Sequence, residues 1–192
     1  MGLRYQLRLY KKRHKKVVVL MNFEMAFDEI MSWEGDYSMD SNDPGGETKY
    51  GISKRAYPNL DIKNLSKEQA KEIYKMDYWD KVNASSLPES VRLMVFDCAV
   101  NQGAPFSRII LQKSLGVVKD GIIGPKTLKA FERVPESLVI SKMAKYRLDR
   151  YSALPHWNVY GKGWTRRLLD ISLKCAFLAQ VELSKSWDLT KK

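Results

Sequence analysis

Residues 33–52 read WEGDYSMDSNDPGGETKYGI, and this stretch joins two different sequence patterns. Upstream of it, apolar residues recur at helical spacing between Phe23 and Met31, which predicts an amphipathic helix over residues 22–34. A glycine then offers a helix stop, since glycine adopts the left-handed conformation that ends many helices. The pattern therefore predicts that a carboxylate, Glu34, stands where this helix ends.

The segment after that helix has no helical periodicity. It contains Asn-Asp-Pro-Gly-Gly at residues 42–46, which is a dense turn signal. Short extended pieces around Tyr37 and around residues 49–52 are predicted to pair as a small hairpin. Together with the upstream helix, this predicts a helix end that faces a small antiparallel sheet.

The rest of the chain is predicted to be mainly α. Ser66 and Gln69 resemble a capping box, which marks a helix start. Residues 89–100 are apolar nearly all round, as in a helix at the centre of a core. Further helices are expected to start at Pro105 and Pro125, to cover residues 136–152, and to run from about Trp164 to Ser186 after a Gly-Lys-Gly turn.

The length of 192 residues suits one well-buried domain, and the charge is uneven along it. Lys and Arg outnumber Asp and Glu by 33 to 22, and residues 1–20 hold seven of these basic residues and no acid. Their apolar run is too short for a secretory or membrane-spanning segment. We expect residues 1–20 to be a disordered basic extension; the alternative is a tail that binds phosphates or membranes weakly by charge.

Cysteine and histidine usage bounds the chemistry. Cys98 and Cys175 fall in apolar helical stretches, where buried free thiols are the usual state. This is compatible with synthesis in a reducing compartment. The two histidines, His14 and His156, form no cluster with metal-ligand spacing, so we expect no metal and no cofactor.

Glu34 has the properties of a proton donor for glycosidic bond cleavage. That reaction needs an acid for the leaving oxygen and a base, nucleophile or stabilising charge on the other side. The negative end of a helix disfavours a carboxylate, and Trp33 with the apolar helix face adds desolvation. We expect Asp43 to orient water or stabilise positive charge, and the Thr48 hydroxyl to hold that water.

Each of these residues also has a purely structural interpretation. A glutamate at a helix end is usually solvated, and Asn-Asp-Pro-Gly is usually only a turn. Asp97 is expected to be a core carboxylate. The remaining candidates are sugar ligands or ordinary packing and helix-end residues, and the sequence leaves both open: Tyr37, Gly46, Tyr50, Tyr78, Trp79, Asn101 and Gln102.

Several motifs together resemble glycoside hydrolase family 108, whose members are phage and bacterial N-acetylmuramidases. EGDYSMDSNDPGGETKYGI (residues 34–52) is similar to the family signature E-G-G-Y…N-D-P-G-G-x-T-x-x-G-I. The resemblance covers residue 21 to the C-terminus. It continues through DYWD (77–80), FDCAVNQG (96–103), LQKSLGVVKDGIIGPKT (111–127) and GWTRRL (163–168).

The resemblance implies that Glu34 is the catalytic acid. Asp36 replaces the second glycine of the signature, which places a second acid beside Glu34 and removes a flexible residue from the loop. A likeness to phage lysozymes implies that Asp43 and Thr48 belong to the site as well. The implied fold is a lysozyme-like helical domain with a small β-hairpin next to the active-site cleft.

The resemblance also implies how the chain is organised. Residues 21–103 would form a lysozyme-like catalytic region, and residues 104–192 a helical peptidoglycan-binding-type region packed on it. The implied partner is bacterial peptidoglycan, and the protein is expected to be a monomer. Without a recognisable signal peptide, we expect synthesis in the bacterial cytoplasm and passage through a holin or comparable pore to the wall.

Two other functions compete with this one. A non-catalytic wall-binding or secretion-assisting protein would use the segment 111–127 without cutting the wall. A nucleic-acid binder would use the net charge of +11, but the charge is concentrated in residues 1–20, so we expect no specific nucleic-acid binding.

Overall fold

The computed structural model describes residues 21–34 and 46–189, and its fold is mainly helical, as predicted. The principal elements, in order, are α1 (Phe23–Met31), β1 (Thr48–Lys49), β2 (Ile52–Ser53), α2 (Lys67–Tyr74), α3 (Glu89–Gln102), α4 (Ala104–Leu115), α5 (Pro125–Lys129), α6 (Glu136–Ser152) and α7 (Trp157–Leu189). A π-helical turn, Lys75–Trp79, and short 3-10 turns connect α2 to α3.

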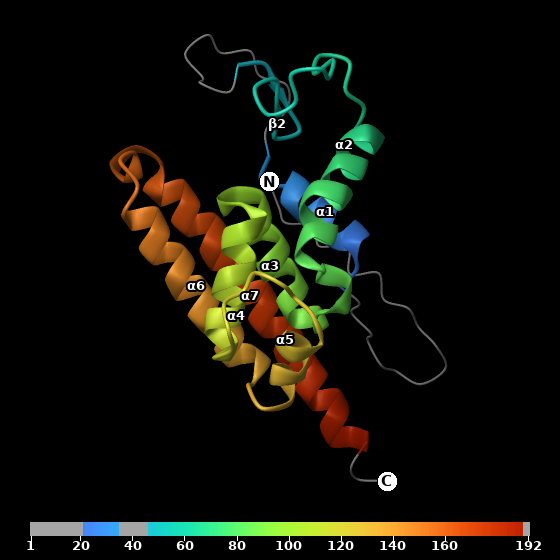
Figure 1. Cartoon of the computed structure of the whole chain (residues 1–192), viewed down its shortest axis with the longest axis vertical. Helices are drawn as coiled ribbons and strands as arrows, with labels where there is room; N and C mark the ends of the chain where they lie inside the picture. The colour runs from blue at the N-terminus through green and yellow to red at the C-terminus, as the bar shows by residue number, and fades with distance from the viewer. Residues whose placement is uncertain (1–20, 35–45, 190–192) are drawn as a thin grey trace.

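α3 is the centre of the molecule, with α1, α4, α6 and α7 around it (Figure 1). Apart from Arg92, every residue from Ser90 to Ala99 is buried, as the all-round apolar pattern predicts. α1 packs Phe27 and Ile30 into the same core. The capping box of α2 is present, with reciprocal bonds between Ser66 and Gln69.

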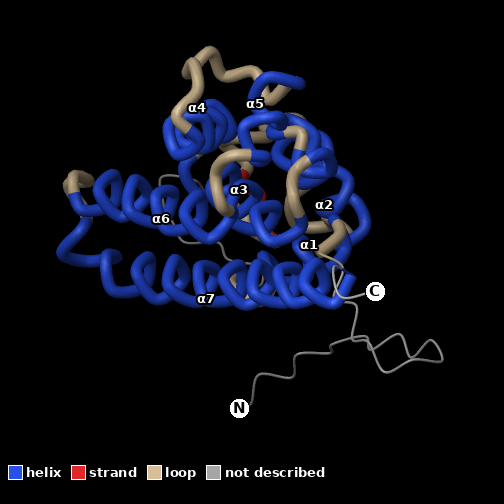
Figure 2. The backbone as a smooth tube through the Cα atoms, turned by 90° about the horizontal axis from the view of Figure 1, so that it is seen from below, coloured by secondary structure: helices blue, strands red, loops and turns tan. Residues whose placement is uncertain are grey.

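α6 and α7 form an antiparallel pair beneath the other helices (Figure 2). The prediction that the last helix follows a Gly-Lys-Gly turn is wrong, because α7 begins at Trp157 and runs straight through these glycines. A Cβ on Gly161 would lie 2.6 Å from the Trp157 ring, so glycine here lets an aromatic ring pack directly on the helix.

The segments that pair in the small sheet also differ from the predicted ones. β1 and β2 pair antiparallel with Thr48 opposite Ser53 and Lys49 opposite Ile52. Residues 49–52 are therefore two strand ends and a turn rather than one strand. Tyr37, the residue around which the sequence predicts the partner strand, lies outside the described residues.

α1 is shorter than predicted, because it ends at Met31 rather than residue 34. Residues 1–20, for which the sequence predicts disorder, lie outside the described residues. Cys98 and Cys175 are buried free thiols, as predicted. Within residues 21–34 and 46–189 no helix is both long and apolar enough to cross a membrane, and no group of acidic, histidine or cysteine side chains has the arrangement of a metal site.

Candidate active site

Glu34 lies three residues after Met31, the last residue of α1. The last helical turn continues past Met31, because the amides of Trp33 and Glu34 both donate to the Ile30 carbonyl, at 2.9 and 3.2 Å. These bonds fix the backbone from which the Glu34 side chain projects. That side chain is 20% exposed, so the carboxyl group is held by protein on most sides and still reaches solvent.

The hairpin turn lies directly against this carboxyl group. Tyr50 and Gly51 form the turn, and both have positive φ, of 52° and 73°. A Cβ on Gly51 would lie 2.7 Å from Oε2 of Glu34 and 2.5 Å from the Tyr74 hydroxyl. The Tyr74 hydroxyl donates to the Tyr50 carbonyl at 2.9 Å, which holds the turn in place. Glycine at residue 51 is therefore needed for both conformation and space.

Arg167 of α7 is the residue that joins Glu34 to the core. Its Nη1 lies 2.7 Å from Oε1 of Glu34, and its Nε donates to Oδ1 of Asp97 at 2.8 Å. The Arg167 side chain is 10% exposed. No residue near Glu34 in the sequence indicates this contact.

Asp97 is the core carboxylate that the sequence predicts, and it is fully buried. Its Oδ2 accepts from Nη2 of Arg147, also fully buried, at 2.5 Å. Burial opposes ionisation of Asp97, but the charges of Arg147 and Arg167 outweigh it and hold the pKa of this carboxyl group below its usual value. Asp97 therefore holds both arginines in place, and Arg167 in turn pairs with Glu34.

Of the predicted sugar ligands, Asn101 and Gln102 sit at the C-terminal end of α3. Asn101 is exposed, and its side-chain amide donates to Oδ1 of Asp97 at 3.2 Å, which connects it to the same polar network. Gln102 turns the other way: its amide nitrogen donates to the Arg147 carbonyl, and its oxygen accepts from Nε of Arg147. Its side-chain amide is therefore engaged with α6.

Of the predicted aromatic ligands, Trp79 is buried in the core, whereas Tyr50 and Tyr78 are partly exposed. Trp79 is 2% exposed, and its indole nitrogen donates to the Ser85 hydroxyl at 2.8 Å. Its predicted role as a sugar ligand is therefore corrected to a core role beside Phe96. Tyr50 and Tyr78 are half-buried. Burial, with further contributions from nearby carboxylates including Glu34, raises the pKa of Tyr78, so its hydroxyl keeps its proton near neutral pH.

The remaining predicted residues belong to the turn-rich segment. Thr48 opens β1, and its hydroxyl donates to the Gly46 carbonyl at 3.2 Å. That bond uses the hydroxyl proton and leaves the oxygen able to accept from water. Gly46 has a φ of 69°, and no atom of the described residues lies within 4 Å of the position that a Cβ would take there. Asp43 lies outside the described residues.

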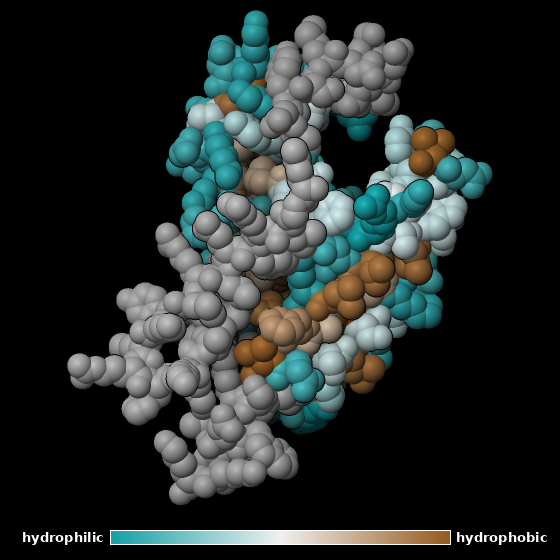
Figure 3. Space-filling model, turned by 180° about the vertical axis from the view of Figure 1, so that it is seen from behind, coloured by the Kyte–Doolittle hydropathy of each residue, from teal (hydrophilic) through white to brown (hydrophobic). Residues whose placement is uncertain are grey.

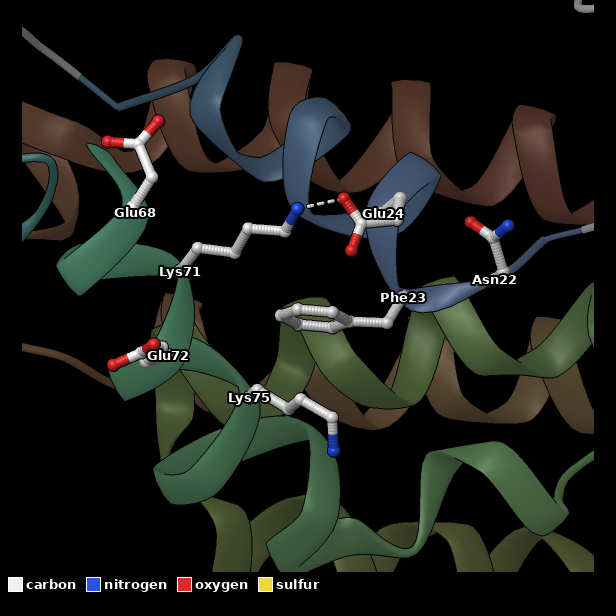
Figure 4. A pocket seen from close by; sticks show the side chains of 7 residues that line it. All are labelled: Asn22, Phe23, Glu24, Glu68, Lys71, Glu72 and Lys75. Atoms are coloured by element: carbon white, nitrogen blue, oxygen red, sulfur yellow. Dashed lines mark hydrogen bonds and ion pairs between the residues drawn. The ribbon is translucent and has the colours of Figure 1, made fainter.

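Glu34 contacts the hairpin turn on one side and α7 on the other. Figure 3 shows a notch between the lobe that carries the hairpin, residues 46–66, and the corner where α6 meets α7. A separate cavity of about 470 Å³ opens at the other end of α1 (Figure 4), and its lining is mainly charged: Asn22, Phe23, Glu24, Glu68, Lys71, Glu72 and Lys75.

Sequence reasoning missed Arg167, Gly51 and Tyr74 as parts of this site. A signal for Arg167 was present, since it lies at helical spacing from the apolar residues Trp164 and Ile171. A charged residue on such a face needs a buried partner. Asp97, the one acid within the apolar part of α3, was the available partner.

Comparisons with known proteins indicate the family of the chain. Residues 27–103 match the family Glycosyl hydrolase 108. The fold is similar to the solved structure of Brucella abortus SagA, with a TM-score of 0.75 and 32% sequence identity over 82% of this chain and 95% of that chain. The comparison with curated proteins gave no match. The chain belongs to glycoside hydrolase family 108. Membership supports a glycoside hydrolase that acts on peptidoglycan.

Proposed function

We propose that this protein is an N-acetylmuramidase that cleaves the β-1,4 glycosidic bond of bacterial peptidoglycan, with Glu34 as the general acid. The observation that carries the proposal is the position of Glu34. Its partly exposed carboxyl group lies just after α1, between the hairpin turn and α7. We propose that the glycan binds across this position, so that the glycosidic oxygen comes within reach of the carboxyl group.

Arg167 gives the acid a defined role in the reaction cycle. When Glu34 donates its proton to the leaving oxygen, it becomes a carboxylate, and Arg167 at 2.7 Å stabilises the new charge. Because Arg167 is itself fixed by Asp97, the cation does not need to move. Preorganised charge of this kind lowers the cost of charge development in the transition state.

The other half of the reaction is assigned to the turn-rich segment. Asp43 is proposed to orient the attacking water or to stabilise the oxocarbenium-like transition state. Thr48 is proposed to hold that water through its remaining acceptor capacity. The protein is proposed to act on the wall outside the cytoplasmic membrane, where its substrate lies.

The chemical identity of the products tests this proposal. Purified peptidoglycan is digested with wild-type protein, and the released muropeptides are reduced with borohydride and analysed by mass spectrometry. We expect the new reducing end on N-acetylmuramic acid. A reducing end on N-acetylglucosamine would overturn the bond assignment. Sedimentation with the wall and no released sugar would favour the alternative, a wall-binding or secretion-assisting protein without catalysis.

The Gly51→Ala variant is expected to lose hydrolysis on the order of 100-fold, because the added methyl group displaces the Glu34 carboxyl group from its position. The matched control is Gly116→Ala. Gly116 has nearly the same φ, 72° against 73°, and no atom within 4 Å of its Cβ position. Both variants carry the left-handed backbone cost of about 1–2 kcal/mol. Equal rates for the two variants would show that Gly51 does not act through Glu34.

A further inference from the structure

Four aromatic rings gather at the corner between α6 and α7. We call this set the corner cluster; its members are Tyr151, Trp157, Tyr160 and Trp164. The ring of Trp164 lies against each of the others: it stacks on Tyr151 with 5.2 Å between centroids, and the centroids of Tyr160 and Trp157 lie 5.8 and 6.5 Å away. The cluster is thus one continuous aromatic surface.

Two residues of the corner cluster lie on the same face of α7 as Arg167 of the candidate active site. Tyr160, Trp164 and Arg167 follow one another at spacings of four and three residues, so they lie on one face of α7. Tyr160 is about 10 Å from Arg167 along the helix axis, at a rise of about 1.5 Å per residue. Because Arg167 contacts Glu34, a chain that lies along this face from Glu34 meets Trp164 and then Tyr160.

The cluster extends beyond the core. In Figure 2 the α6–α7 corner projects well past the ends of the other helices. Tyr160 is 55% exposed, and Trp157 and Trp164 are only half-buried. At its base, Tyr151 is buried, and its hydroxyl lies 3.4 Å from Nη2 of Arg147, one turn earlier in α6. Arg147 in turn donates from Nε to the side chain of Gln102, at the C-terminal end of α3. The notch of Figure 3 separates this corner from the hairpin lobe.

The corner cluster leaves aromatic surface accessible to a ligand, mainly on Tyr160. The corner rings present flat faces bordered by polar groups, because Tyr hydroxyls and Trp indole nitrogens hydrogen-bond while their rings remain apolar. A pyranose ring has the complementary form, with an apolar face of C–H groups and hydroxyls around its edge. The ligand class that matches both properties is a neutral saccharide.

We propose that the corner cluster is a stacking platform for a sugar residue of the bound glycan, about two helical turns away from the bond that is cut. This inference rests on the proposed function, since it places the same glycan across Glu34. Tyr160 is the residue that contacts the sugar, and the ring of Trp164 packs against the ring of Tyr160. The cluster determines how long a glycan the enzyme prefers, because a short one cannot reach from Glu34 to Tyr160.

The test measures glycan binding in the Glu34→Gln background, so that the ligand is not consumed. The probes are soluble peptidoglycan glycan fragments of two and of six sugars, titrated by calorimetry. Adding Tyr160→Ala is expected to weaken binding of the six-sugar fragment about 3- to 10-fold, the range of a lost aromatic contact. Adding Tyr160→Phe is expected to restore it. Binding of the two-sugar fragment is expected to change with neither substitution.

The control is Phe177→Ala, farther along the same helix and on a different face. Phe177 is 59% exposed, similar to Tyr160, so its substitution removes a comparable ring away from the corner cluster. In the Glu34→Gln background, Phe177→Ala is expected to leave the affinity for the six-sugar fragment unchanged. With active protein, Tyr160→Ala is expected to raise KM for long glycans and to leave kcat near the wild-type value.

Two kinds of failure are distinguishable. If wild-type protein cuts peptidoglycan and Tyr160→Ala binds long and short fragments as tightly as its parent, the platform is refuted and the proposed function stands. An equal loss for both fragment lengths would also refute it, since it would indicate a general structural effect. If wild-type protein neither cuts nor binds glycan, the proposed function itself fails.

Discussion

Glu34→Gln protein is expected to retain its fold and lose hydrolysis of peptidoglycan by about 10²–10⁴-fold, the usual contribution of a general acid. Glutamine has the shape of glutamic acid but has no acidic proton to give to the leaving oxygen. Its amide can still lie between the Gly51 turn and Arg167. The measurement is the initial rate of turbidity loss of purified peptidoglycan, with circular dichroism to compare the folds.

Glu29→Gln is the matched control for this prediction. Glu29 is a glutamate of α1, and its side chain is 12% exposed. Like Glu34, it pairs with an α7 residue, here Lys174 at 2.5 Å. It differs from Glu34 in lying within the helix rather than against the hairpin turn. Activity close to wild type is expected for Glu29→Gln. A folded Glu34→Gln protein with the activity of this control would remove Glu34 from the mechanism.

Asp97→Asn is expected to cause the largest loss of stability, about 3–5 kcal/mol in the free energy of unfolding. The substitution preserves the shape of the side chain and removes the charge that both arginines share. Arg147 is then a fully buried cation without a counter-ion. Urea unfolding monitored by circular dichroism gives the free energy directly.

The comparison for Asp97→Asn is Asp149→Asn. Asp149 is also paired with a basic residue, Lys145 at 2.7 Å, but its side chain is 57% exposed. Exposed pairs one helical turn apart contribute only about 0.3–0.5 kcal/mol. Similar losses for the two variants would mean that the buried network around Asp97 does not hold α7 on α3.

The fold was predictable where one local pattern decides the structure. The apolar run that forms α3, the capping box at Ser66 and the start of α6 after Pro135 needed no tertiary information. The start of α7 was not predictable in this way. Glycines usually end helices, and only the Trp157 ring packed on Gly161 explains why this helix continues through them.

The site was predictable for residues near one another in the sequence and not for the others. Glu34 and the hairpin are close in the chain, so helix and turn signals indicated a carboxylate after the first helix and a hairpin near it, although the strands that pair are 48–49 and 52–53. Arg167 is 133 residues away from Glu34, and no local pattern reports such a contact. Trp79 shows the converse, because an aromatic residue near a site in sequence can still face the core, and burial is a property of the assembled fold.

The distance between Glu34 and Arg167 along the chain has a consequence for biosynthesis. A nascent polypeptide that has not yet been extended past residue 167 exposes Glu34 without its cationic partner and leaves α3 uncovered where α7 would pack. Interrupted translation therefore yields fragments that lack the assembled site.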